Sequence, residues 1–349
     1  MKMNDKSLSS PSNMWLEVRE IPAAVKRLLE HGSGAIEDAA RAALAVDPVV
    51  IATVARGSSD HAATFFKYVA ELKLGLPVAS IGPSVASIYG AQLKFLRGIC
   101  VSISQSGQSP DIVEMARVAR AGGAVTLAVT NHANSPLAQT SDMTIDICAG
   151  PELSVAATKT FVTSAVSLVS LIAHWTNDAD LKSAMKQLPE QLAQAAEMDW
   201  PDLRAALMGQ SSLFTLGRGP AFAIACEAAL KFKEVSQLHA ESYSSAEVLH
   251  GPVSIVQSGF PVIAFAAGDA AENTVAEIAD QLAEKGARAF VTSAKVRKAN
   301  VLPVVRTGHP LLDPLPLIVS FYAMVEKFAR DVGIDPDTPR HLKKVTKTT

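Results

Sequence analysis

The stretch ICVSISQSGQSPD at residues 99–111 decides the expected fold, because it passes from an apolar run through a polar loop into a helix. The run at 99–104 has the length and the β-branched content of a buried strand. Ser109 suits a helix N-cap, and Pro110 suits the first helical position, where its missing N–H costs nothing. A strand that leads directly into a helix is typical of parallel α/β sheets.

Strand and helix patterns alternate along most of the chain in the same way, which predicts parallel strands joined by crossover helices. In the first half we expect strands at residues 49–55, 78–81, 99–104, 124–130 and 143–147, and helices at 58–73, 110–121, 156–175 and 181–196. In the second half we expect strands at 213–216, 262–266 and 289–292, and helices at 221–237 and 272–285.

Two short matches indicate an internal repeat. TVARG at residues 53–57 and TLGRG at 215–219 each end a predicted strand and precede a predicted helix. We therefore expect two copies of one α/β unit within the 349 residues. The predicted organisation is an N-terminal helical extension, a first unit with a linker helix, a second unit and a C-terminal tail, at residues 1–40, 41–200, 201–335 and 336–349.

Composition and charge exclude several classes of protein. Hydrophobic residues make up 48% of the chain and charged residues 19%, which excludes a disordered chain. The net charge of −2 offers no general attraction for nucleic acid or for an anionic membrane. The apolar run at 161–173 is shorter than the roughly 20 residues of a spanning helix. Without a signal-peptide core at residues 1–12, and with Cys100, Cys148 and Cys226 in apolar stretches, we expect a cytoplasmic protein.

The loop that follows the run at 99–104 has the features of a phosphate site. Ser104, Ser106 and Ser109 offer hydroxyls, and backbone N–H groups meet there at the positive end of a helix dipole. A second polar loop at 57–59 also follows a predicted strand. The alternative is a serine-rich turn that only caps the helix. Because neither a Walker loop nor a G-x-G-x-x-G motif occurs, we expect a phosphorylated small metabolite rather than a nucleotide.

Glu227, Lys231 and Glu234 lie four and three residues apart, which places them on one face of a predicted helix. Further ionisable residues follow, among them His239 and His250. A carboxylate base, a histidine and a nearby lysine are the groups that enolisation and ring opening of a sugar require. The alternatives are a solvated charge ladder or a metal site. We expect no metal, since no H-x-x-x-H or H-E-x-x-H spacing occurs.

Several motifs in this order resemble the sugar isomerase (SIS) domain family, in particular the tandem-SIS isomerase half of glucosamine-6-phosphate synthase and stand-alone type II glucosamine-6-phosphate deaminases. The motifs are SQSG at 104–107, ATKTF at 157–161, EAALKFKE at 227–234, HAE at 239–241, HGP at 250–252 and PRHLKK at 339–344. The resemblance implies an α/β fold of two tandem SIS domains. Each is a mainly parallel, flavodoxin-like sheet flanked by helices in three layers, and a C-terminal tail follows.

The resemblance also implies roles for individual residues. Glu234 is the implied base that moves a proton between C1 and C2, His250 the ring-opening acid–base, and Lys344 the tail lysine that reaches the sugar carbonyl. The implied phosphate-binding and substrate-binding residues are Ser58, Ser59, Ser104, Gln105, Ser106, Ser109, Val155, Glu227 and Lys231. The family implies no cofactor. It implies a homodimer, in which His250 reaches the site of the neighbouring subunit, and a tail that folds over the site as a lid.

Four features depart from the pattern of the synthase. Arg56 stands where the synthase has a cysteine, and Leu249 stands where it has a lysine. Lys343 adjoins Lys344, so the choice of reactive tail lysine stays open. The synthase carries a glutamine-hydrolysing domain with an N-terminal nucleophilic cysteine, whereas residue 2 here is Lys2 and about 40 residues precede the first strand. We therefore expect no glutamine hydrolysis.

These observations favour a phosphosugar isomerase that converts glucosamine 6-phosphate to fructose 6-phosphate and ammonia. The same residues also suit a fructosamine-6-phosphate deglycase or a ketose/aldose phosphate isomerase of the tagatose type. A fourth hypothesis, from another class, is a phosphosugar-binding regulatory protein. It is disfavoured because no basic helix-turn-helix segment precedes residue 49, and because regulators of the family generally lack the full Glu–His–Lys set.

Overall fold

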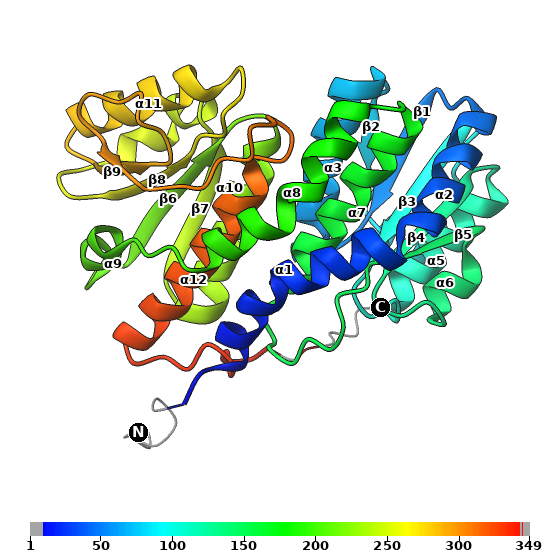
Figure 1. The fold of residues 1–349 in the computed structure, drawn as a ribbon, viewed down its shortest axis with the longest axis horizontal. Coiled ribbons are helices and arrows are strands. Elements are labelled where there is room, and N and C mark those ends of the chain that lie inside the picture. The colour runs from blue at the N-terminus through cyan, green and yellow to red at the C-terminus, as the bar shows by residue number, and fades with distance from the viewer. Residues whose placement is uncertain (1–9, 343, 345–349) are drawn as a thin grey trace. The chain divides into compact units, whose positions relative to one another are not determined.

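The computed structural model of the chain describes residues 10–342 and residue 344. The chain divides into two compact units (Figure 1). The first unit contains Ala23–Glu152, Lys159–Lys186 and the tail residue Lys344. The second unit contains Leu153–Thr158, Gln187–Leu342 and the described residues before Ala23. Each unit holds one five-stranded sheet, and every pairing between strands is parallel, which confirms the predicted α/β fold.

The sheet of the first unit has the strand order β2-β1-β3-β4-β5. Its strands are β1 (Val50–Val54), β2 (Val78–Ser80), β3 (Gly98–Ile103), β4 (Val125–Thr130) and β5 (Met143–Asp146). All six residues of β3 are buried, as expected for a central strand covered on both faces. This strand order is that of flavodoxin-like folds, and it reverses between β1 and β3. The reversal marks the place where such sheets bind ligands.

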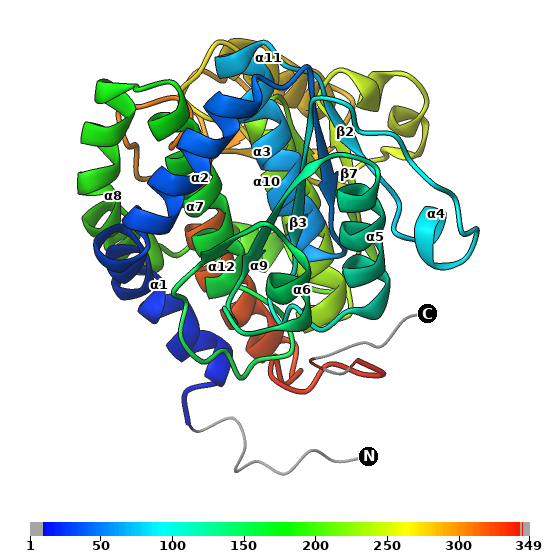
Figure 2. The ribbon, with the colours of Figure 1, turned by 90° about the vertical axis from the view of Figure 1, so that its right-hand side faces the viewer.

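Helices cover both faces of the first sheet, as Figure 2 shows. One group consists of α2 (Ser33–Val46), α3 (Ser58–Leu74) and α7 (Lys159–Trp175), in which α2 and α3 both pack against α7. The other group consists of α4 (Ser84–Ser87), α5 (Pro110–Ala121) and α6 (Pro136–Thr140). The predicted helix at 156–175 begins later, at Lys159. The Glu152 side chain accepts a hydrogen bond from the Thr160 N–H, which satisfies a donor of the first turn of α7.

The sheet of the second unit has the strand order β10-β9-β8-β6-β7. Its strands are β6 (Ser212–Gly217), β7 (His239–Ser244), β8 (Pro261–Phe265), β9 (Arg288–Val291) and β10 (Asn300–Val301). Numbered from the first strand of each sheet, both orders are 2-1-3-4-5, so the two units share one topology. The apolar pattern of the sequence does not predict β7 or β10. Both lie at an edge of the sheet. β7 is largely polar and β10 has only two residues, so neither has the apolar run that predicts β6, β8 and β9.

The second unit also contains most of the remaining helices. They are α9 (Pro201–Leu207), α10 (Pro220–Ser236), α11 (Glu272–Glu284), α12 (Pro314–Asp331) and the short 3₁₀ helices η1 (Glu247–Leu249) and η2 (Pro252–Ile255). Two helices contain residues of both units, α1 (Asn13–His31) and α8 (Ala179–Ala196). In the part of the chain that the structure describes, no helix has both the length and the apolar composition needed to cross a membrane.

Aromatic rings from α10, α12 and β8 form the core on one face of the second sheet. The Phe321 ring lies 5.1 Å from that of Phe232 and 5.9 Å from that of Phe265, both edge to face. All three side chains are wholly buried. Edge-to-face pairs add stabilisation beyond the burial of apolar area. The cluster therefore fixes α10, the helix that carries the predicted catalytic carboxylate, against α12.

The Phe321→Ala substitution should lower the free energy of unfolding by about 3–5 kcal/mol, because it leaves a cavity inside this cluster. The measurement is guanidinium unfolding followed by the fluorescence of Trp200, which is buried in the same unit. Tyr89→Ala is the matched control, since Tyr89 is 79% exposed and its loss should cost less than about 0.5 kcal/mol. Equal losses for the two variants would show that the cluster does not stabilise the unit.

Candidate active site

The loop between β3 and α5, residues 104–109, is held in one conformation by its own hydrogen bonds; we call it the serine loop. Ser104 Oγ accepts a hydrogen bond from the Gly107 N–H at 3.2 Å, and Gly107 O accepts one from the Leu137 N–H at 3.1 Å. Gly107 has a φ of +60°, and a Cβ there would overlap the Ser135 side chain. Only glycine fits this turn, so the neighbouring hydroxyls occupy defined positions.

The serine loop keeps hydroxyl groups at the start of α5. Ser109 is the N-cap residue, but its side chain accepts no hydrogen bond from the helix and can turn toward a ligand. Ser106 Oγ accepts a hydrogen bond from the Gln108 N–H at 3.3 Å, and Gln105 O accepts one from the Asn131 N–H at 3.1 Å. The positive end of the α5 dipole favours an anion here.

Ser58 and Ser59 lie at the same edge of the first sheet as the serine loop. They form the first turn of α3, which follows β1, and β1 pairs in parallel with β3. Arg56, which departs from the family pattern, forms an ion pair with the buried Asp111 of α5. The ion pair ties the loop after β1 to the helix after β3. These two loops flank the point where the strand order reverses.

The predicted carboxylate–lysine ladder on α10 is buried rather than solvated. The side chains of Glu227 and Lys231 are fully buried, and Glu234 is 19% exposed. Lys231 Nζ lies 3.4 Å from Glu227 Oε1 and forms a direct ion pair with Glu234. Burial alone would lower the pKa of Lys231, but the two carboxylates raise it above its ordinary value. The lysine is therefore a cation, and the hypothesis of a solvent-exposed ladder is wrong.

Glu227 has a further partner that the sequence did not indicate. The Tyr322 hydroxyl on α12 donates a hydrogen bond to Glu227 Oε1 at 3.0 Å. With the inner carboxylate bonded by both a phenol and an ammonium, only Glu234 combines an ion pair to Lys231 with access to solvent. Glu234 is thus the member of the ladder that can meet a substrate.

Two histidines of the second unit, His239 and His250, lie on its edge strand β7 and in the segment that follows it. His239 Nδ1 is within 3.1 Å of Ser212 Oγ. His250 ends the η1 turn, where its backbone N–H donates to Glu247 O at 2.8 Å, and it is exposed. Gly251, with a φ of 131°, allows the chain to turn directly after it. No group of three or more potential metal ligands occurs among the residues that the structure describes.

The tail lysine Lys344 bonds to a buried carboxylate of the first unit. Its Nζ donates a hydrogen bond to Glu152 Oε2 at 2.8 Å, and Glu152 is fully buried. Burial alone would raise the pKa of Glu152, but Lys344 and two hydrogen bonds from Thr160 hold it below its ordinary value of 4.5. Glu152 therefore stays ionised. The alternative tail lysine, Lys343, lies outside the described residues.

Val155 lies in the short segment Leu153–Thr158, which belongs to the second unit. The backbone N–H groups of Leu153 and Ser154, just before it, donate hydrogen bonds to the Glu17 carboxylate. The distance from Ser154 N to Glu17 Oε1 is 3.1 Å. Glu17 is buried, so these bonds hold the backbone near Val155 in a fixed position. This anchor comes from α1, far away in the sequence.

The structure distributes the predicted site residues over both units. The first unit contains Ser58, Ser59, Ser104, Gln105, Ser106, Ser109 and Lys344. The second unit contains Val155, Glu227, Lys231, Glu234 and His250. Each unit thus carries a distinct set of functional groups, hydroxyls with a tail lysine in the first and ionisable groups in the second.

In the second unit, the loop that corresponds to the serine loop follows β8 and lacks hydroxyls. The Gly268 N–H there donates to Asp313 Oδ2 at 2.7 Å, and Arg306 Nη1 donates to the same oxygen at 2.6 Å. A carboxylate of the chain itself thus accepts the hydrogen bond that this loop donates through Gly268.

Comparison with known proteins places this architecture in a family. The model of the SIS domain matches residues 48–174 and 206–296, which together cover more than half of the chain. The chain belongs to the SIS domain family. The two matched segments contain the two parallel sheets apart from β10, and they include the serine loop and the α10 ladder.

Relatives of this SIS protein resemble it over nearly its whole length. The glutamine–fructose-6-phosphate aminotransferase (isomerizing) of Sulfurisphaera tokodaii is 32% identical over 343 residues, which are 96% of this chain and 56% of that protein. A solved structure of a candidate phosphosugar isomerase from Silicibacter pomeroyi DSS-3 is 61% identical, has a TM-score of 0.91, and covers 94% of this chain and 100% of that one.

A second solved structure matches at lower identity. It is the C-terminal domain of the glucosamine-fructose-6-phosphate aminotransferase of Francisella tularensis, which is 26% identical with a TM-score of 0.83. The match covers 97% of this SIS chain and 100% of that domain. The chain spans about half the length of the curated aminotransferases that it matches.

Lys344→Ala should destabilise the protein near pH 7 by about 1–3 kcal/mol, because it removes the partner of a buried charge. Glu152 has a lowered pKa in the folded protein, so its contribution to stability is present above 4.5 and is lost as the pH falls through the lowered value. In Lys344→Ala the burial of Glu152 is no longer offset by a cation, so protonation of Glu152 at low pH removes the cost of burying its charge. The difference in unfolding free energy between wild type and Lys344→Ala should therefore become smaller as the pH falls. The measurement is denaturant unfolding of both proteins at about pH 7 and at successively lower pH.

Lys344→Arg is the matched control, since it keeps a cation beside Glu152 and should retain most of the stability. Lys94→Ala, at an exposed lysine of the same unit, should have no effect. A deficit of Lys344→Ala that does not change with pH would argue against the ion pair as its cause.

Proposed function

We propose that this SIS protein is a phosphosugar isomerase that converts glucosamine 6-phosphate and water to fructose 6-phosphate and ammonia, without glutamine hydrolysis. The observation that carries the proposal is Glu234, the partly exposed end of the otherwise buried ladder on α10. A carboxylate held at one position beside an ammonium is suited to move a proton between neighbouring carbons of a sugar. The identity with a candidate phosphosugar isomerase over its full chain supports the substrate class.

In this proposal the serine loop binds the phosphate group. Its hydroxyls and the N-terminus of α5 supply hydrogen-bond donors and a positive dipole without a basic side chain. Ser58 and Ser59, at the same edge of the sheet, and Val155 contact the sugar. Phosphate binding of this kind gives affinity that is equal for substrate and transition state, so it holds the sugar in place while other groups do the chemistry.

The proposed reaction begins with ring opening, in which His250 transfers protons between the ring oxygen and the hydroxyl at C1. Glu234 then removes the proton at C2 while the carbonyl oxygen at C1 gains a proton, which gives an enol amine. Return of a proton to C1 and loss of one from the nitrogen convert the enol amine to an imine at C2. Water adds to this imine and ammonia leaves, so the product is the ketose phosphate. Lys344 interacts with the sugar carbonyl, and Lys231 and Glu227 hold Glu234 in position. No cofactor is needed, because no net oxidation occurs.

Purified protein incubated with glucosamine 6-phosphate should release ammonia and fructose 6-phosphate in equal amounts. Glu234→Gln should reduce kcat at least about 100-fold, because it removes the base and retains the shape of the side chain. Glu284→Gln, at an exposed carboxylate of α11, should leave kcat unchanged. Turnover of wild type no faster than that of Glu234→Gln would refute the proposed deaminase.

The alternatives use the same residues, and each predicts a different result in that assay. A fructosamine-6-phosphate deglycase acts on glycated amine phosphates, and a tagatose-type isomerase interconverts phosphosugars without releasing ammonia. A regulatory protein binds phosphosugars without turnover. A panel of amino, glycated and simple sugar phosphates therefore separates the four functions.

We also propose that the protein works in the cytoplasm. The three cysteines form no disulfide, which supports this proposal.

We further propose that the protein acts as a homodimer in which His250 serves the site of the neighbouring subunit. The exposure of His250 on a turn after the edge strand β7 supports this role, since such a side chain is accessible to a second copy. The family resemblance supports it as well. No nucleic acid or membrane takes part in the proposed activity.

Mixing two inactive variants tests this arrangement directly. His250→Ala and Lys344→Ala should each be inactive as pure dimers. After equal mixing and subunit exchange, about half of the dimers are mixed, and each mixed dimer has one site with both native residues, so roughly a quarter of wild-type activity should return. Activity that stays at the level of the separate variants would show that each site uses the histidine of its own chain.

A further inference from the structure

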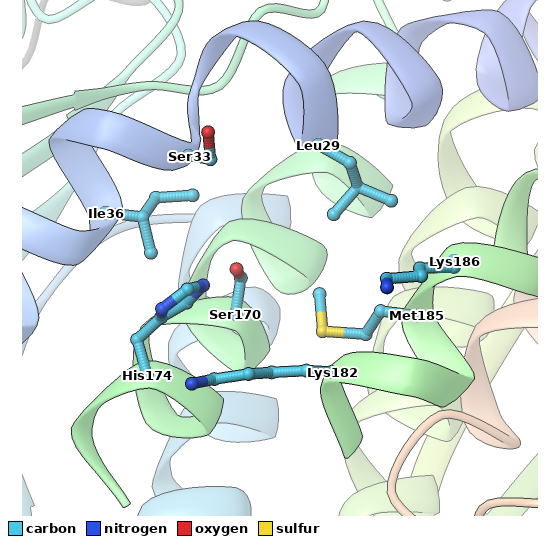
Figure 3. Close-up of a pocket in the computed structure, with 8 residues that line it drawn as sticks. All are labelled: Leu29, Ser33, Ile36, Ser170, His174, Lys182, Met185 and Lys186. Atoms are coloured by element: carbon cyan, nitrogen blue, oxygen red, sulfur yellow. The ribbon is translucent and has the colours of Figure 1, made fainter. Parts of the chain in front are cut away.

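A pocket of about 270 Å³ lies among the helices of the first unit (Figure 3). Residues of α1, α2, α7 and α8 line it, and none of them comes from a loop that follows a strand. Its volume is close to the lower end of the range for small-molecule sites, about 300–1,000 Å³. The pocket is therefore separate in the fold from the serine loop and large enough for a small ligand.

Two lysines of α8 lie on one side of the pocket. Lys182 and Lys186 are four residues apart on α8, and Figure 3 shows both side chains along the rim of the pocket. Lys182 Nζ donates a hydrogen bond to Asn177 Oδ1 at 2.9 Å. Within the described part of the chain, neither lysine forms an ion pair. Like charges at this spacing repel each other on a helix, and an anion between them would offset that cost.

Polar groups opposite the lysines could also contact an anion. Ser33 is the first residue of α2, where the helix dipole is positive. The Ser170 side chain is only 5% exposed, and its hydroxyl faces the pocket (Figure 3). Burial and the charge of Lys182 lower the pKa of His174, against the opposing effect of Glu37. His174 is thus neutral near pH 7 and can donate one hydrogen bond.

The remaining lining of the pocket is apolar. Leu29, Ile36 and Met185 form it, and the Met185 thioether points into the space in Figure 3. Inorganic phosphate alone would leave this surface without contacts, whereas a neutral apolar molecule would leave the lysines without a counter-charge. The combination selects a ligand with one anionic group and a compact apolar body.

We propose that this pocket is a binding site for a small organic anion. A phosphate or carboxylate group is attracted by the charges of Lys182 and Lys186 and accepts a hydrogen bond from Ser170. The apolar part of the ligand packs against Leu29, Ile36 and Met185. The site is independent of the proposed reaction, since none of these residues belongs to the predicted catalytic or phosphate-binding set.

The Met185 methyl group gives a readout inside the pocket. The protein has nine methionines, so methyl-labelled methionine yields a simple NMR spectrum in which Met185→Leu assigns the signal. Phenyl phosphate and benzoate are the anionic probes, benzyl alcohol is the neutral probe, and inorganic phosphate tests the anion alone. We expect one or both anionic probes to shift the Met185 signal saturably, with benzyl alcohol and inorganic phosphate binding at least tenfold more weakly. A shift from only one of the two identifies the preferred headgroup.

The double variant Lys182→Gln, Lys186→Gln should bind the anionic probes at least tenfold more weakly, whereas Lys94→Gln should bind them as wild type does. Glutamine is compatible with the exposed surface of α8, so the variant should fold, and its unchanged remaining methionine signals verify this. The proposal is overturned if neither anionic probe shifts Met185 at roughly 10 mM. It is equally overturned if benzyl alcohol binds as tightly, or if the double variant binds like wild type.

Discussion

Parallel pairing of the strands is the constraint on which the rest of the structure depends. A parallel pair cannot be closed by a tight turn, so each strand is followed by a crossover and the carboxyl ends of one sheet meet at one edge. The strand order reverses between β1 and β3, and sheets of this topology bind ligands at such a reversal. The serine loop and the first turn of α3 lie at this position because the topology brings them there, although about 45 residues separate them.

Buried charge determines which groups of the second unit are available for chemistry. An isolated ion inside a protein costs several kcal/mol, so Lys231 is stable there only with carboxylates on both sides. The same pairing removes Glu227 from contact with solvent and leaves Glu234 at the accessible end. In the first unit, Glu152 follows the same rule with Lys344 and the first turn of α7. The position of each buried charged side chain thus depends on the groups that pair with it more than on the element that carries it.

Buried strands and the loops after them were predictable from the sequence, because a short apolar run such as residues 99–104 is compatible with few structures other than a buried strand. The edge strands β7 and β10 were not, since pairing on one side only requires no apolar run. The sequence indicated the ladder on α10 by its spacing, but not its burial, which depends on α12. Tyr322 and Glu152 carried no signal because their partners lie 95 and 192 residues away. The roles of the predicted site residues themselves stay predictions.

The carboxylate of Asp313 gives the two units different capacities despite their common topology. In the first unit the loop after the third strand is the proposed phosphate site, whereas in the second unit the corresponding loop is bonded to Asp313 and Arg306. A covalently attached anion has a very high effective concentration, so a free phosphate cannot displace it easily. The common topology of the two units therefore does not imply a second phosphate site of the kind that we propose. In our proposal the first unit binds an external anion, whereas the corresponding loop of the second unit is bonded to a carboxylate of the chain itself.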